Sequence, residues 1–94
     1  MLAGDPVSSD LPIVNKKGLH ARAAAKFVQC AERYEATVTV SKDAHTVGGT
    51  SIMGLMMLAA GMGSSIHVTA TGPDAADALA ALSALVADRF GEGE

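Results

Sequence analysis

Residues 65–89 read SIHVTATGPDAADALAALSALVADR, and two periodicities meet in this stretch. Apolar and polar residues alternate through residue 71, as they do in a strand with one buried face. Gly72-Pro73-Asp74 then favours the start of a helix, because proline suits the first helical position and an acidic residue suits the positive end of the helix dipole. The strand is predicted to point Ile66, Val68 and Ala70 inward. The helix is predicted to end at Gly91, with a stripe formed by Ala75, Ala78, Leu79, Leu82, Val86 and Arg89.

The rest of the chain repeats these two patterns. Runs at 11–14, 36–41 and 45–47 predict three further strands, and helical spacing from Ala21 and from Thr50 or Ser51 predicts two further helices. The order β-α-β-β-α-β-α indicates an α+β fold, with a four-stranded antiparallel sheet, three helices on one face and the other face open to solvent. The helical stripes are expected to be Ala24, Phe27, Val28 and Ala31 in the first helix, and Leu55, Leu58, Ala59 and Met62 in the second.

The size of the chain fits one domain, since 94 residues can form a single core. Residues 1–10 lack the basic start and apolar run of a signal peptide, so we expect a flexible leader there. We expect the domain at residues 11–90 and a frayed C-terminus at 91–94. No apolar stretch approaches the roughly 20 residues that span a bilayer. We therefore expect a cytoplasmic protein without membrane insertion. A monomer is the simplest expectation, although the sequence does not indicate the oligomeric state.

Charge is unevenly distributed along the chain. The net charge of −3 argues against nucleic-acid binding, which relies on the neutralisation of phosphates. Most of the basic residues nevertheless fall within residues 16–33, and no acidic residue lies between positions 16 and 31. His20 lies inside this basic zone, although the clustering also fits a solvated helix face. The basic zone comprises Lys16, Lys17, Arg22, Lys26 and Arg33.

The sequence gives no sign of a metal or cofactor site. Cys30 is the single cysteine, which excludes an intramolecular disulfide and a multi-cysteine metal site. His45 and His67 have no neighbouring cysteine or carboxylate pattern, so we interpret both as surface residues. A glycine-rich phosphate loop and a Ser-His-Asp arrangement are also missing from the sequence.

The segment Gly18-Leu19-His20-Ala21-Arg22 is the first candidate for chemistry. His20 directly precedes a predicted helix, and the first N–H groups of a helix have no internal partners and favour an anion. A phosphate on His20 would meet the N–H groups of Ala21 and Arg22, with the Arg22 guanidinium nearby. A neutral imidazole is a suitable nucleophile near physiological pH. The alternative is a histidine that only caps the helix.

Ser51 and the residues after it form the second candidate. Thr50 or Ser51 is predicted to cap the second helix. A phosphate added to Ser51 would gain from the helix dipole, and the alternative is that Ser51 is only an N-cap. If Leu55 and Leu58 point inward, then Ile52, Met53 and Met56 lie outside or at the edge. Exposed methionines make an adaptable docking patch. The alternative is that these side chains tuck under a neighbouring loop.

Two motifs together carry a family resemblance. Residues 15–28, NKKGLHARAAAKFV, and residues 51–58, SIMGLMML, resemble the HPr family, the histidine-containing phosphocarriers of the phosphoenolpyruvate:sugar phosphotransferase system (PTS). The resemblance covers about residues 11–90, and the family's fold is an open-faced β-sandwich, which agrees with the predicted element order. Ala23 departs from the family pattern, because proline commonly follows the arginine; we expect altered rigidity near His20 rather than lost function.

The resemblance implies a role for each matching residue. His20 would accept phosphate on Nδ1 from phosphorylated Enzyme I and pass it to a histidine of an EIIA-type protein, with Arg22 helping to hold the phosphate. Ser51 would be the serine that an HPr kinase/phosphorylase modifies in some bacteria. The partner-binding surface would include Lys26, Ile52, Met53 and Met56. Such a protein is a stoichiometric carrier rather than an independent turnover enzyme, and the transfer needs no metal or other cofactor.

Three alternatives remain open at this point. The first is a carrier of the nitrogen-related PTS branch, which controls regulators rather than sugar uptake. The second is a small metal-binding or ligand-sensing module, against which the absence of paired cysteines argues. The third is a paralogue that only binds a regulator, against which the presence of both His20 and Arg22 argues.

Overall fold

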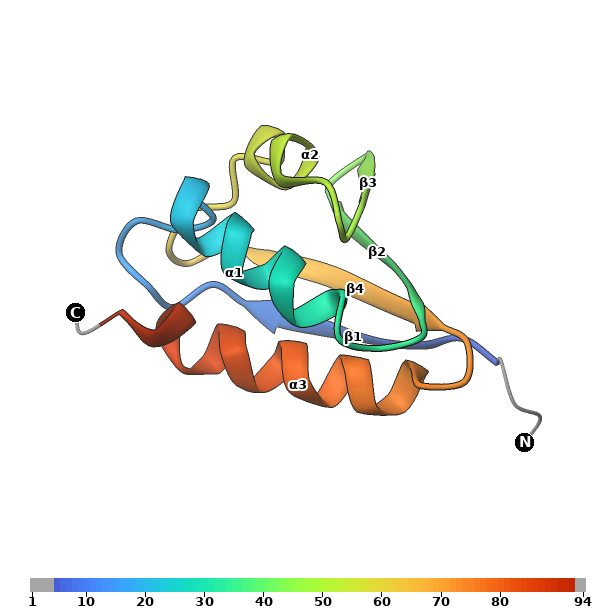
Figure 1. The fold of residues 1–94 in the computed structure, drawn as a ribbon. Coiled ribbons are helices and arrows are strands. Elements are labelled where there is room, and N and C mark those ends of the chain that lie inside the picture. The colour runs from blue at the N-terminus through green and yellow to red at the C-terminus, as the bar shows by residue number, and fades with distance from the viewer. Residues whose placement is uncertain (1–4, 93–94) are drawn as a thin grey trace.

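The computed structural model describes residues 5–92, and its four strands form one antiparallel sheet in the order β1-β4-β2-β3. The helices cover one face of this sheet, with α1 and α3 lying side by side and α2 beside the start of α1 (Figure 1). The predicted fold class is therefore confirmed. The elements are β1 Val7–Pro12, α1 Ala21–Ala31, β2 Thr37–Lys42, β3 His45–Gly48, α2 Ile52–Met57, β4 Ser65–Thr71, α3 Ala75–Ala87 and the short 3-10 helix η1 Arg89–Gly91.

Strand β4 is the centre of the sheet and of the core. It pairs with β1 on one side and β2 on the other, and it pairs Val68 with Val40 and Ile66 with Leu11 across these ladders. Ile66, Val68 and Ala70 are fully buried, as the alternation predicted. Their burial on the helix-covered face leaves the polar residues of the same strand on the open face.

Strand β1 begins earlier than the sequence indicated. It spans Val7–Pro12, so the expected leader is wrong for residues 7–10, while residues 1–4 lie outside the described part of the chain. Ser9 points toward the covered face between Val7 and Leu11, where an apolar residue would have revealed the alternation. Because β1 is an edge strand, it tolerates polar residues and Pro12 at its end.

The stripes of α1 and α3 are largely as predicted, whereas α2 is shorter. Leu55 and Leu58 are buried, but α2 ends at Met57. Ala59 has a φ of 52°, which the helix cannot continue through, so Ala59 and Met62 are exposed rather than part of a stripe. Within residues 5–92, no helix is both long enough and apolar enough to cross a membrane.

The C-terminal segment after α3 lies at the same end of the molecule as the start of α1, and η1 contacts α1 (Figure 1). Phe90, in η1, is fully buried, and the Lys26 ammonium donates a hydrogen bond of 2.7 Å to its carbonyl. Arg89 is exposed and lies outside α3, contrary to the predicted stripe. The expected fraying is also wrong for Gly91, which lies in η1, and for Glu92, which makes side-chain hydrogen bonds; residues 93–94 lie outside the described part.

Replacement of Phe90 tests how much its burial stabilises the C-terminal segment. We expect Phe90→Ala to lower the free energy of unfolding by about 3–5 kcal/mol, because removal of a fully buried ring leaves a cavity. Met57→Ala removes an exposed side chain and should change the same quantity by less than about 0.5 kcal/mol. Urea unfolding followed by circular dichroism measures both. Equal losses in the two variants would show that Phe90 does not anchor the segment.

Candidate functional site

The loop before α1 is pressed against the segment that follows α2. Gly18 has a φ of 66°, and a Cβ at this position would lie 2.4 Å from the carbonyl oxygen of Ala60. The next residue, Leu19, donates its N–H to the same carbonyl at 2.9 Å. Only glycine fits this close approach, so Gly18 fixes where the chain enters α1. Beside it lies a hollow of about 210 Å³ lined by Lys17, Leu19, His20, Ala59, Ala60 and Gly61.

His20 occupies the N-cap position of α1 with extended backbone angles. Its carbonyl accepts the N–H of Ala24 at 2.8 Å, and its side chain makes no capping hydrogen bond. His20 therefore occupies the N-cap position, but its side chain does not cap the helix. The earlier N–H groups of α1, including those of Ala21 and Arg22, have no acceptor within the helix. A helix start of this kind favours an anion.

A carboxylate that the sequence analysis missed contacts the imidazole. Nε2 of His20 contacts Oε2 of Glu92, and Nδ2 of Asn15 donates to Oε1 of Glu92 at 3.0 Å. The same Nδ2 donates to the carbonyl of Gly18 at 2.8 Å, and Asn15 is completely buried. Since 72 residues separate the two members of the His20–Glu92 pair, no local pattern could have revealed it.

The basic zone divides into an exposed and an anchored part. Lys16, Lys17 and Arg22 are exposed near the start of α1. The side chain of Arg22 makes no hydrogen bond or ion pair with any other residue in the range 5–92, so its guanidinium remains available to a ligand. Lys26 differs from these exposed residues, because it is half-buried and its ammonium donates a hydrogen bond to the carbonyl of Phe90.

Ser51 and the α2 side chains lie as the second motif suggested. Ser51 is the exposed N-cap of α2, and its Oγ accepts the N–H of Gly54 at 2.9 Å. Ile52, Met53 and Met56 are exposed rather than tucked under a loop. Their exposed fractions are 40%, 70% and 39% respectively. Together they form an apolar patch that we call the α2 patch.

The other histidines lie outside this site. His67 is on the open sheet face, where its Nδ1 forms a 2.7 Å contact with Oδ1 of Asp10, and His45 is exposed at the start of β3. An exposed pair such as His67–Asp10 contributes little to stability. Among residues 5–92, no three or more His, Cys, Asp or Glu side chains gather closely enough to hold a metal ion.

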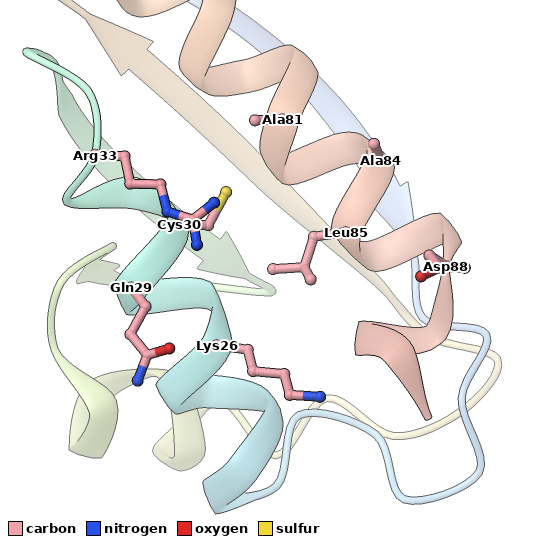
Figure 2. Close-up of a pocket in the computed structure, with 8 residues that line it drawn as sticks. All are labelled: Lys26, Gln29, Cys30, Arg33, Ala81, Ala84, Leu85 and Asp88. Carbon is pink, nitrogen blue, oxygen red and sulfur yellow. The ribbon is translucent and has the colours of Figure 1, made fainter. Parts of the chain in front are cut away.

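A larger hollow of about 680 Å³ lies between α1 and α3 and does not include His20 (Figure 2). Burial raises the pKa of the Cys30 thiol, and the nearby Arg33 charge opposes this shift. The thiol is therefore expected to stay protonated at neutral pH, which makes it a poor nucleophile. The hollow is lined by Lys26, Gln29, Cys30 and Arg33 of α1 and by Ala81, Ala84, Leu85 and Asp88 from α3 and its C-cap.

Comparisons with known proteins agree with this geometry. The family model described as "PTS HPr component phosphorylation site" matches residues 7–88. The phosphocarrier protein HPr of Cupriavidus necator is 52% identical over 85 residues, covering 90% of this chain and 96% of that protein. The crystal structure of HPr-C-His from Thermoanaerobacter tengcongensis aligns with a TM-score of 0.89 at 40% identity, covering 94% of this chain and 99% of the other. An HPr dimer structure from the same organism aligns with a TM-score of 0.74 at 43% identity, covering 87% and 94%.

The Ser51 cap gives a direct stability test. We expect Ser51→Ala to lower the free energy of unfolding by about 1 kcal/mol, because the Gly54 N–H loses its acceptor at the start of α2. Ser51→Asn supplies another capping oxygen and should recover most of this loss. Urea unfolding of both variants measures the difference. A Ser51→Ala variant as stable as the wild type would remove the cap from our description of α2.

Proposed function

The chain belongs to the HPr family of PTS phosphocarriers, and from this premise we propose that His20 accepts a phosphoryl group on Nδ1 from Enzyme I and donates it to a histidine of an EIIA-type protein. The matched model covers residues 7–88 and therefore includes His20, Arg22 and Ser51. The carrier is used stoichiometrically, since each molecule holds one phosphoryl group, on one histidine, in each transfer.

One observation carries this proposal. The His20 ring lies at the start of α1 with Nε2 occupied by Glu92, and Nδ1 makes no hydrogen bond to any residue in the range 5–92. The N–H groups of Ala21 and Arg22 lie at the same helix start, where phosphate oxygens are favoured. A nucleophilic nitrogen and an anion-binding position therefore occupy one exposed end of the helix.

The transfer itself requires little from this chain beyond position and charge. The lone pair of His20 Nδ1 attacks phosphorus, an N–P bond forms there, and the N–P bond of the donor breaks with its electron pair returning to the donor histidine. The helix N–H groups and the exposed Arg22 guanidinium offset the charge on the shared phosphoryl group. Donation to the acceptor is the reverse of this step.

Docking is supported by two neighbouring surfaces. The α2 patch exposes Ile52, Met53 and Met56, and methionine side chains adapt to differently shaped partners. The exposed basic residues Lys17 and Arg22 lie at the start of α1. These surfaces fit a partner face that combines acidic residues with an apolar centre. Enzyme I and an EIIA-type acceptor would use this face in turn.

Phosphorylation with Enzyme I and phosphoenolpyruvate tests the proposal. We expect the wild-type chain to gain acid-labile, base-stable phosphate and His20→Ala to gain none. His67→Ala is the matched control, because His67 is also exposed and also contacts a carboxylate, so it should be labelled like the wild type. Label that persists in His20→Ala would falsify the assignment of the site.

We further propose that Ser51 is a site of regulatory phosphorylation by an ATP-dependent HPr kinase/phosphorylase. Ser51 is exposed directly before the α2 patch, so a phosphate on Oγ would place negative charge beside Ile52 and Met53. This charge would weaken the docking of Enzyme I through repulsion and through desolvation of the phosphate. The same hydroxyl caps α2, so a phosphate added to it would lie at the start of that helix.

The test of Ser51 uses ATP and a lysate of the source bacterium, with acid-stable phosphate as the readout. We expect label in the wild type and in Thr50→Ala but not in Ser51→Ala, because Thr50 is the neighbouring exposed hydroxyl. Label that disappears in Thr50→Ala and remains in Ser51→Ala would reject Ser51 as the modified residue.

A further inference from the structure

We propose that Glu92 is a positioning residue for His20: its carboxylate holds the imidazole in the tautomer that carries the proton on Nε2 and leaves the lone pair on Nδ1. The inference rests on the proposed function, because it assigns the nitrogen that receives the phosphoryl group. The matched family model ends at residue 88, so Glu92 lies beyond the segment it describes.

The C-terminal segment is anchored independently of Glu92. Arg89, Phe90 and Gly91 all have positive φ, which turns the chain sharply after α3. The buried Phe90 ring and the hydrogen bond from Lys26 to the Phe90 carbonyl hold this turn in place. The anchored backbone therefore places Glu92 at the start of α1. Substitution of its side chain leaves both anchors intact.

Asn15 orients the carboxylate. Its Nδ2 donates both to the carbonyl of Gly18 at 2.8 Å and to Oε1 of Glu92 at 3.0 Å, which leaves Oε2 of Glu92 on the imidazole. Asn15 is fully buried, and rotation of its amide would turn an oxygen toward the carbonyl of Gly18. The Glu92 and His20 side chains are only 12% and 25% exposed, so this contact is better shielded than a surface ion pair.

The chemistry of the two groups sets the tautomer. An ionised carboxylate can only accept hydrogen bonds, so the His20 nitrogen that faces it must donate. A neutral imidazole carries one N–H, and the hydrogen bond of one nitrogen thereby decides the state of the other. With the proton on Nε2, the lone pair lies on Nδ1.

The same contact acts during the transfer. When the N–P bond forms at Nδ1 and the donor N–P bond breaks, the His20 ring keeps its Nε2 proton and becomes positively charged. The Glu92 carboxylate offsets that charge without touching the phosphoryl group. When the N–P bond of His20 breaks in turn, the electron pair returns to Nδ1 and the ring is neutral again. No proton has to move in either direction.

The Glu92→Gln variant tests whether the carboxylate sets the tautomer of the His20 ring. Because Asn15 Nδ2 keeps donating toward the side-chain oxygen of residue 92, the glutamine would turn its NH₂ group toward His20. Nε2 would then have to accept, and the ring proton would move to Nδ1. The isosteric Glu92→Gln substitution should therefore reduce the availability of the Nδ1 lone pair more than Glu92→Ala does, because Glu92→Ala only removes the contact.

The experiment measures the tautomer and the transfer rate separately. Two-bond ¹H–¹⁵N spectra of the unphosphorylated full chain with the ring in its neutral form report which nitrogen carries the proton. We expect Nε2–H in the wild type, a mixture in Glu92→Ala and a shift to Nδ1–H in Glu92→Gln. The rate of phosphorylation by Enzyme I should fall about 10-fold in Glu92→Ala and further in Glu92→Gln.

Asp88→Asn is the matched control, because it removes an exposed carboxylate from the end of α3, four residues before Glu92. It should keep the wild-type tautomer and rate. A wild-type ring protonated on Nδ1, or a Glu92→Gln ring with the wild-type tautomer, would overturn the role of Glu92. These spectra need no partner protein, so a failure of the wild type to take phosphate from Enzyme I would count against the proposed function alone.

Discussion

The close approach of Gly18 to the carbonyl of Ala60 is the constraint on which the site depends. It joins the loop before α1 to the segment after α2, and there is no space for a Cβ at that point. As a result, the start of α1 is fixed next to the end of α2, although the two are separated by the β2–β3 hairpin. His20 and the α2 patch are thereby brought to one side of the molecule by backbone packing rather than by their own side chains.

The turn after α3 is a second constraint on the site. Its backbone is strained, and the contacts of Phe90 stabilise it. Arg89 and Phe90 both have a φ of 56°, and a left-handed conformation costs an L-residue about 1–2 kcal/mol. Burial of a Phe side chain contributes about 1.5–3 kcal/mol. The charged hydrogen bond from Lys26 adds about 1.5–3 kcal/mol. The two anchors therefore offset the strain of the turn, and the turn delivers Glu92 to the site.

The sequence predicted the helices and strands whose apolar residues repeat at helical or alternating spacing. The stripe of α1 and the alternation of β4 repeat through apolar residues, so both elements were found, and with them the helix start that carries His20. Strand β1 was missed at its beginning because Ser9 takes an inward position. The Glu92 contact was missed for a different reason, since it depends on the φ values of Arg89 and Phe90 and on a buried Asn15 more than 70 residues away. Nothing in the composition of residues 88–92 distinguishes an anchored turn from a frayed end.

Under the proposed transfer at Nδ1, the two nitrogens of His20 have opposite requirements, and two different parts of the fold meet them. Nδ1 must be exposed and close to N–H groups that favour an anion, which the start of α1 supplies. Nε2 must be held in one protonation state, which requires an acceptor that is shielded and cannot rotate. A residue from α1 itself could not serve, because side chains of the first turn lie beside the phosphate position and a carboxylate there would repel it. The acceptor therefore has to come from a distant part of the chain, and the anchored turn after α3 is the element that reaches this side of the ring.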